Sequence, residues 1–328
     1  MCYKCKICAN SLGNKNFIVR EMQFGTQKNF IYFQCSSCGC LQITEPPKDM
    51  SKYYPRDGYY SFRQPRNNKT YLQRTKNLIK YLLVNIYLLP FGTFFFKKFP
   101  YINTIENSGK HKMCLKILRN LKKTSSILDV GCGVGILLQE MNMWGFKNLT
   151  GIDPFIEKDI FYSSGLKIFK QDAFTHIGNY DFIMLHHSFE HMDNPRLILE
   201  QLYKMLNPNG VLLIRIPVSD SFAFRKYGSN WFQIDAPRHF YLHTTRSMVL
   251  LSKNAGFILK EIVYDSTKEQ FIESENYCRD ISWLEYKDFS PTHYFNSHYI
   301  KKCRKYARYL NNLLDGDQAA FVFQKPIG

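Results

Sequence analysis

The stretch that most constrains the fold is the run ILDVGCGVG at residues 127–135. An apolar segment typical of a buried strand passes directly into three glycines at alternate positions. Glycine tolerates left-handed backbone angles and lets a ligand approach the main chain closely. A helix that begins after such a loop offers unpaired N–H groups to an anionic or polar ligand. The run therefore predicts a strand–loop–helix unit that binds a nucleoside.

Two carboxylates sharpen this prediction. Asp153 ends the run Gly151-Ile152-Asp153, at the carboxyl end of a second predicted strand, where it can accept from both ribose hydroxyls. Asp172 follows a third strand, where it can accept from an adenine amine. The glycine loop reads GxGxG, whereas the dinucleotide fingerprint is GxGxxG, which argues against an NAD site.

Strands and helices alternate from about residue 107 onward, which predicts an α/β fold with a doubly wound parallel sheet. Seven strands are predicted, at 125–130, 148–153, 166–171, 180–186, 211–217, 257–264 and 319–324. Helices are predicted at about 108–122, 135–144, 195–206, 245–255 and 297–314, with a short one between the second and third strands. The helix that starts near Pro195 is expected to end at residues 207–210, where Asn209-Gly210 suits a helix exit, and residues 217–244 read as loop.

Four motifs, ILDVGCGVG, GIDP, QDAF and YDFIMLHHSFEHMDNP, occur in an order and spacing that resemble the class I S-adenosylmethionine (SAM)-dependent methyltransferases. Within them the chain resembles the group related to ubiquinone-biosynthesis O-methyltransferases. The resemblance implies SAM as cofactor and a Rossmann-like seven-stranded sheet. It implies that Asp153 binds the ribose, and that Asp172 and Ala173 contact the adenine. It also implies that the methionine part is framed by Asp129, Gly131, Gly133 and Gly135.

Cysteines dominate the N-terminus, with six of the ten inside the first 45 residues. Cys5 and Cys8 form one C-x2-C pair, and Cys35 and Cys38 form a second. Four thiolates in two such pairs suit a tetrahedral zinc ion, which can supply on the order of 10 kcal/mol of folding free energy to a segment too small for a good core. A redox C-x2-C is the rival, without a surrounding βαβ pattern to support it. Whether Cys2 or Cys40 joins the site stays open.

Three domains follow: a zinc-ribbon-like domain at 1–45, a linker with an apolar and basic helical segment at 46–107, and a methyltransferase domain at 108–328. The first, continued by CGCLQITEPPKDMSKYY, resembles the zinc-binding domain that precedes bacterial sugar C-methyltransferases and enzymes of surface-polysaccharide clusters. The longer sugar C-methyltransferases carry a further C-terminal domain, so C-methylation is in doubt here. The apolar run 81–89 is too short for a membrane span; it predicts a helix that packs on the catalytic domain, or shallow membrane contact.

Histidines follow the fourth predicted strand, in the run HHSFEH at 186–191, where the methyl group is expected. Imidazole titrates in the right range for a base that removes the acceptor's proton. His191 is the first candidate, with Glu190 orienting it, and His187 is next. The alternative for each histidine is a structural role.

A second polar and aromatic run, at 231–243, is predicted to cover the acceptor, and its PRHFYLHT element resembles one in the polysaccharide-cluster relatives. Trp231 can stack on a ring, and Arg238 can hold a phosphate or carboxylate. His239 and His243 are further candidates for a base or a substrate contact. The alternative is that the run simply packs against the sheet.

The formal charge of +17 favours anionic partners, and no export signal precedes the cysteines, which predicts reduced thiols in the cytoplasm. The amine-methylating run Asn/Asp-Pro-Pro-Tyr/Phe is absent, which favours a hydroxyl or an activated carbon as acceptor. We expect a small anionic acceptor, a nucleotide-linked or lipid-linked sugar of surface-polysaccharide biosynthesis. The alternatives are an RNA methyltransferase, a quinone or lipid O-methyltransferase at the inner face of the membrane, and a non-catalytic SAM-binding protein.

Overall fold

The computed structural model describes residues 3–54, 79, 81–89 and 112–327. The chain divides into two compact units. Unit 1 contains residues 1–55, 186–203 and 214–326, and unit 2 contains 56–185, 204–213 and 327–328. Most of the predicted linker at 46–107 lies outside the described residues; within it, 81–87 is helical, as the sequence predicts.

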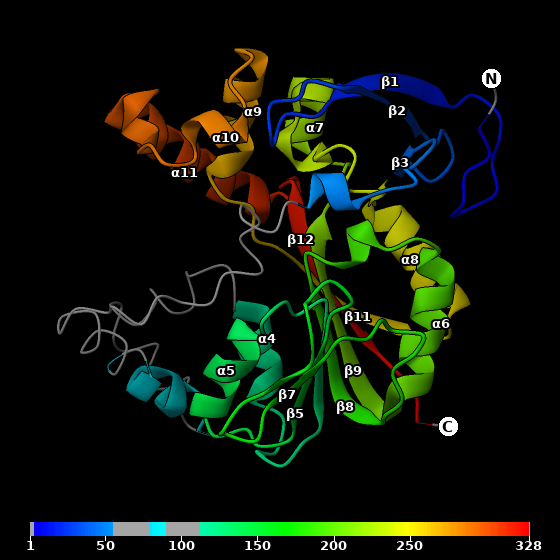
Figure 1. The fold of residues 1–328 in the computed structure, drawn as a ribbon, viewed down its shortest axis with the longest axis vertical. Coiled ribbons are helices and arrows are strands. Elements are labelled where there is room, and N and C mark those ends of the chain that lie inside the picture. Colours follow the sequence, from blue (N-terminus) through cyan, green and yellow to red (C-terminus); the bar gives the residue numbers. More distant parts are fainter. Residues whose placement is uncertain (1–2, 55–78, 80, 90–111, 328) are drawn as a thin grey trace. The chain divides into compact units, whose positions relative to one another are not determined.

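The parallel strands of unit 2 carry the predicted α/β pattern (Figure 1). They belong to a sheet with the strand order β11-β12-β9-β8-β4-β5-β7-β6. Asp129 on β4 is in register with Gly151 on β5 and with Met184 on β8, and both pairs are parallel. The elements of unit 2 are α4 (Lys112–Leu118), β4 (Ile127–Val130), α5 (Ile136–Met143), β5 (Leu149–Ile152), β6 (Ile160–Phe161), β7 (Lys167–Phe169) and most of β8 (Tyr180–His186). The mostly parallel sheet predicted from the sequence is confirmed.

Two local predictions are wrong. No helix forms between β5 and β7; the short strand β6 pairs antiparallel with β7 instead, with Ile160 opposite Ile168 and Phe161 opposite Lys167. The helix exit predicted at Asn209-Gly210 lies inside β9 (Leu206–Pro217), which begins directly after α6 (Pro195–Met205). A Cβ at Gly210 would lie 2.8 Å from the Asn207 carbonyl oxygen, so the glycine serves a close approach within the strand.

A second sheet in unit 1 joins distant parts of the sequence. Its order is β1-β2-β3-β10, from β1 (Lys15–Arg20), β2 (Asn29–Gln34), β3 (Leu41–Ile43) and β10 (Tyr241–Leu242). Tyr241 pairs with Gln42, and Leu242 with Leu41. The cysteine-rich N-terminus therefore shares its sheet with the run that the sequence assigned to a loop.

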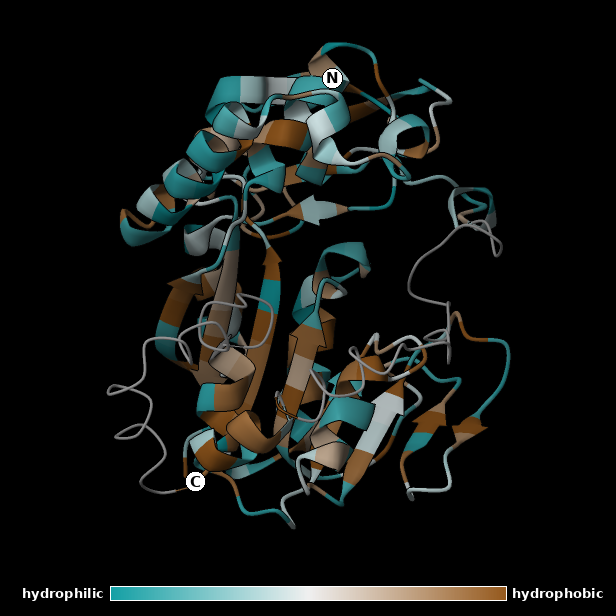
Figure 2. Ribbon diagram, turned by 90° about the vertical axis from the view of Figure 1, so that its left-hand side faces the viewer, coloured by the Kyte–Doolittle hydropathy of each residue, from teal (hydrophilic) through white to brown (hydrophobic). Residues whose placement is uncertain are grey.

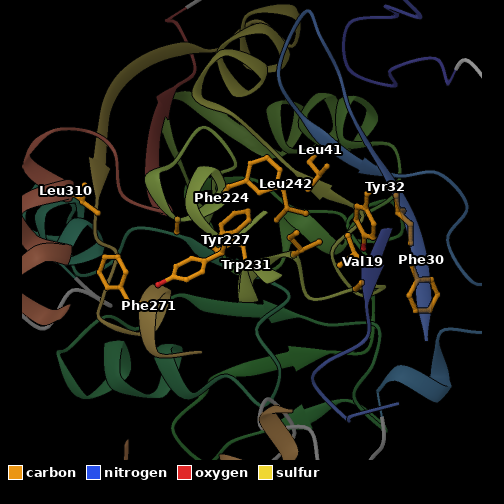
Figure 3. Packing of buried hydrophobic residues seen from close by; sticks show 14 of the residues in the cluster. Val19, Phe30, Tyr32, Leu41, Phe224, Tyr227, Trp231, Leu242, Phe271 and Leu310 are labelled. Atoms are coloured by element: carbon orange, nitrogen blue, oxygen red, sulfur yellow. The ribbon is translucent and has the colours of Figure 1, made fainter. Parts of the chain in front are cut away.

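Unit 1 also contains more helix than the sequence predicted. Its remaining elements are α7 (Phe222–Tyr227), α8 (Thr245–Asn254), β11 (Ile258–Tyr264), α9 (Glu269–Cys278), α10 (Trp283–Tyr286), α11 (Ser297–Asn312) and β12 (Gln318–Gln324). The helix α8 begins as predicted, with a capping box between Thr244 and Ser247. A core cluster joins both ends of the unit: Tyr32 and Leu41 pack with Phe224, Tyr227 and Trp231 (Figure 3).

The strands of the larger sheet are mostly hydrophobic (Figure 2). This agrees with parallel strands that are covered on both faces. In the described part of the chain, no helix has the length and apolar character needed to cross a bilayer.

Candidate active site

The glycine loop after β4 has the backbone that the sequence predicts. Gly131, Gly133 and Gly135 have φ angles of +77°, +54° and +71°, in the left-handed region that favours glycine. Asp153 fastens this loop: its Oδ2 accepts from the Gly133 N–H at 2.8 Å, and its Oδ1 accepts from the Phe155 N–H at 2.8 Å. The loop is therefore fastened to the residue that follows β5.

Two more carboxylates surround this loop and the end of β7. Asp129 is buried at the end of β4, and burial together with the charge of Asp153 raises its pKa to about 8. Asp172 is exposed; although burial opposes it, hydrogen bonds from Thr175 lower the pKa of this carboxyl. Ala173 beside it is buried. Asp129 thus favours its neutral, protonated form, whereas Asp172 favours its charged form.

A second cluster lies in unit 1. Glu190 and His191 belong to the 3-10 helix η4 (Phe189–His191), which follows β8, and His239 lies just before β10. One ligand atom from each of these three residues lies within 4.8 Å of the others. The two imidazole rings meet edge to face with centroids 4.6 Å apart. His239 Nε2 lies 3.8 Å from Asp235 Oδ2 and 4.0 Å from Glu190 Oε1.

The backbone favours one tautomer in both rings. His239 Nδ1 lies 2.7 Å from the Gln233 carbonyl oxygen, and His191 Nδ1 lies 2.9 Å from that of Arg238. A carbonyl oxygen only accepts, which favours the tautomer with the proton on Nδ1 and Nε2 as an acceptor in each neutral ring. The Tyr54 hydroxyl is a second neighbour of His191 Nδ1, at 3.1 Å. Burial and the neighbouring His239 lower the pKa of His191 to about 4. His191 is therefore neutral at physiological pH.

His187 is engaged on both sides. Its Nδ1 lies 3.3 Å from Glu190 Oε1, and its Nε2 lies 2.5 Å from an Arg215 nitrogen. Arg215 is in turn paired with Asp265 at 2.6 Å. Although burial opposes it, His187 helps to hold the pKa of Glu190 at about 2. The chain thus keeps a buried, charged carboxylate among histidines, and both ring nitrogens of His187 are engaged, Nδ1 by Glu190 and Nε2 by Arg215.

The predicted substrate residues Trp231 and His243 are in the interior. Trp231 is 1% exposed, packs beside Phe224 and Tyr227, and donates its indole N–H to Asp317 at 3.1 Å (Figure 3). His243 is fully buried, and burial lowers its pKa to about 3. Their placement gives no support to the predicted contact with a substrate.

Arg238, the predicted anion contact, is also fully buried. Its guanidinium donates to Asp235 and to Glu21, the latter at 3.2 Å. These two carboxylates accept from the guanidinium N–H groups that the sequence interpretation assigns to a phosphate or carboxylate of the substrate. The arginine instead holds Asp235 beside His239, so it acts through the cluster and not on a ligand.

The four predicted zinc ligands form a compact cluster. Cys5 and Cys38 have sulfurs 3.6 Å apart, and those of Cys8 and Cys35 are 3.5 Å apart. A tetrahedral ion with Zn–S bonds of about 2.3 Å would place its sulfurs about 3.8 Å apart, so the cluster is compatible with zinc. Cys40 is buried outside it, with its sulfur 3.9 Å from His243 Nδ1, and Cys2 lies outside the described residues.

Residues 106–261 match a family model described as "Methyltransferase domain". These residues form a class I SAM-dependent methyltransferase domain. The chain is 28% identical over 191 residues to the ubiquinone biosynthesis O-methyltransferase of Psychrobacter arcticus, covering 49% of this chain and 72% of that protein. It is 31% identical over 115 residues to that of Psychrobacter cryohalolentis, covering 30% of this chain and 44% of the relative. A solved SAM-dependent methyltransferase from Archaeoglobus fulgidus is 18% identical, with a TM-score of 0.40, over 64% of this chain and 90% of that one.

The sequence analysis missed two acidic residues beside this methyltransferase's histidines. Asp235 and Glu21 flank Arg238, and Asp235 also faces His239. A signal for Asp235 was available, because it precedes Arg238 by three residues and His239 by four. Glu21 had none, because it lies 217 positions before Arg238.

Proposed function

We propose that this methyltransferase transfers the methyl group of SAM to a hydroxyl oxygen of a small molecule. The observation that carries the proposal is the pair of adjacent rings His191 and His239, with Nε2 of His239 near the carboxylates of Glu190 and Asp235. His191 follows the parallel strand β8 along the chain. Ligands of parallel sheets bind outside the carboxyl ends of such strands.

For the cofactor, we assign Asp153 to the ribose hydroxyls and Asp172 with Ala173 to the adenine. Asp129 and the glycine loop frame the methionine part. The buried carboxyl of Asp129, with its pKa raised to about 8, suits this role because a cationic amino group beside it would restore its charge. SAM supplies a strongly electrophilic methyl group, so the chain has to orient the acceptor and remove its proton.

His239 is our choice for the general base. Asp235 and Glu190 lie 3.8 and 4.0 Å from its Nε2, the atom that would take the proton of the acceptor hydroxyl. His191, with its pKa lowered to about 4, is a weaker base and serves to position the hydroxyl. This order differs from the one expected from the sequence, in which His191 comes first, because Asp235 and Glu190 both lie within 4.0 Å of His239 Nε2.

The acceptor class is a second part of the proposal. The charge of +17 favours an anionic acceptor, and we propose a nucleotide-linked or lipid-linked sugar. The names of the relatives, ubiquinone biosynthesis O-methyltransferases, favour a hydroxyl of a quinone precursor as the second candidate. We further propose that Cys5, Cys8, Cys35 and Cys38 hold a structural zinc ion.

The test measures release of S-adenosylhomocysteine with two acceptor panels, nucleotide sugars and dihydroxybenzoates. With whichever acceptor is turned over, we expect His239→Asn to lower kcat by roughly 10²–10⁴-fold, the usual contribution of a positioned base. His191→Asn should raise KM more than it lowers kcat. Calorimetry should find SAM affinity unchanged in both. His243→Asn is a buried-histidine control, and full turnover in His239→Asn would contradict the proposal.

A further inference from the structure

A hollow of about 960 Å³ lies in unit 1, apart from the histidine cluster. It adjoins the proposed zinc site, because Cys5, Cys8 and Cys38 are among its lining residues, but no ligand has been assigned to the rest of it. Its walls are the loop Lys4–Ala9, the first turn of α6 and the outer face of α8. Five cations line it: Lys4, Lys6, Arg196, Arg246 and Lys253. No carboxylate is among the lining residues.

The wall from α8 has a regular pattern. Arg246, Val249, Leu250 and Lys253 line the hollow at spacings of three, one and three, which places them on one helix face. Met248 on the opposite face is fully buried. Arg246 and Lys253 are two turns apart, about 10 Å along the axis. Between these two cations lies an apolar strip, in which Val249 is 37% exposed.

The charges of the hollow are not balanced within the protein. Lys6 pairs with Asp193 at 3.2 Å, and Arg196 pairs with Glu200 at 2.9 Å. Within the described part of the chain, the side chains of the other three cations have no hydrogen bond or ion pair. That leaves an excess of three positive charges. Four thiolates on one divalent ion at the adjoining cysteines would remove two of them, and the hollow would stay positive.

Arg196 adds a second sign that an anion belongs here. It occupies the first turn of α6, a helix of eleven residues. A cation at a helix N-terminus is unfavourable, because the backbone N–H groups already make that end positive. An anion bound in the hollow would offset this cost.

We propose that the hollow binds a ligand that joins a diphosphate to a ring-shaped or apolar body, with a nucleoside diphosphate as the chemistry that fits. Arginine and lysine at the ends of the α8 face hold the phosphates through charge-assisted hydrogen bonds. The strip of Val249 and Leu250 covers the body of the ligand. The volume lies at the upper end of the range of small-molecule sites, about 300–1,000 Å³. The inference does not depend on which acceptor is methylated.

Calorimetry on the full chain tests it, with UDP as the probe and saturating S-adenosylhomocysteine present to fill the cofactor site. We expect saturable UDP binding that is weakened at least about tenfold in R246E/K253E. The matched control is K301E/K305E, which makes the same charge change on the exposed face of α11 and should bind UDP as the wild type does. R246Q/K253Q removes the two positive charges without adding negative ones, and it should also weaken UDP binding. This variant keeps the test decisive if the charge-reversing variant R246E/K253E does not fold.

Three results would overturn the proposal. One is the absence of saturable UDP binding. Another is equal UDP affinity in the wild type and R246Q/K253Q. The third is tight binding of a single-stranded RNA oligomer where UDP does not bind, which would make the hollow part of a nucleic-acid surface. Inorganic pyrophosphate should bind more weakly than UDP, and equal affinity would contradict the role given to Val249 and Leu250.

Discussion

Among single residues, Asp129 has a strongly perturbed carboxyl group, since burial and Asp153 raise its pKa from 3.8 to about 8. Between these two pH values the folded carboxyl keeps a proton that the unfolded chain has lost. The contribution of Asp129 to stability therefore falls as the pH rises from about 4 to about 8. Asparagine resembles the protonated form, so Asp129→Asn should raise the melting temperature of the ligand-free protein at pH 8 while weakening SAM binding.

Scanning calorimetry and a SAM titration of the same samples measure both effects. Asp172→Asn is the matched control, because hydrogen bonds from Thr175 lower the pKa of that carboxyl in spite of burial. Its charged form is favoured in the folded state, so the substitution should lower the melting temperature at pH 8 and not raise it. A lower melting temperature for Asp129→Asn would show that the buried carboxylate is already compensated within the protein.

The positions of candidate site residues could be predicted from the sequence where a residue directly follows a predicted strand. Asp153 and Asp172 follow parallel strands, and the motif order pointed to their shared edge. The sequence analysis did not foresee the interior positions of Trp231 and Arg238, because residue type does not reveal exposure. The sequence alone favours Arg238 as an anion contact, because its partner Glu21 lies far away in the sequence and the ion pair between them becomes visible only in the fold.

At the scale of elements, the loop between β4 and α5 depends on glycine for two separate reasons. Gly135 has a left-handed φ of +71°, and a Cβ there would lie 2.5 Å from Ile168 Cδ1 on β7. Gly165 has a similar φ of +87°, but a Cβ there would meet nothing within 4 Å. Alanine at Gly165 should cost about 1–2 kcal/mol from backbone strain alone.

Alanine at Gly135 should cost a further 1 kcal/mol or so, because the β7 side chain has to move. It should also weaken S-adenosylhomocysteine binding, whereas Gly165→Ala should leave the affinity unchanged. Urea unfolding and a ligand titration of both variants provide the comparison. Equal losses of stability and affinity in the two proteins would mean that packing against Ile168 is not what requires glycine at residue 135.

Long periodic elements were predictable, and short ones were not. The helix α8 carries its own capping box and its following Gly256, so its bounds were clear in the sequence. The strand β10 has only two residues and exists because β3 lies beside it. Pairing between residues so far apart leaves no local periodicity, and the segment therefore read as a loop.

For unit 1 as a whole, the cysteine cluster is coupled to later parts of the chain by hydrogen bonds. Thr244, the N-cap of α8, donates its hydroxyl hydrogen to the Cys38 carbonyl oxygen at 2.6 Å, and β3 pairs with β10. A cap residue contributes about 1 kcal/mol to its helix. Loss of a metal from the cluster should therefore loosen β10 and α8 as well as the N-terminal segment.

We expect about one zinc ion per chain in protein purified without chelators, as a four-thiolate site holds a single ion. Cys35→Ser should lose the metal, lower the melting temperature and speed amide exchange in Tyr241–Leu242 and in α8. Elemental analysis and hydrogen exchange measure these effects, and Cys278→Ser, at an exposed cysteine, should change neither. If the metal were lost while exchange in α8 stayed as slow as in the wild type, the cluster would be an independent module, and the shared sheet would contribute little to the stability of unit 1.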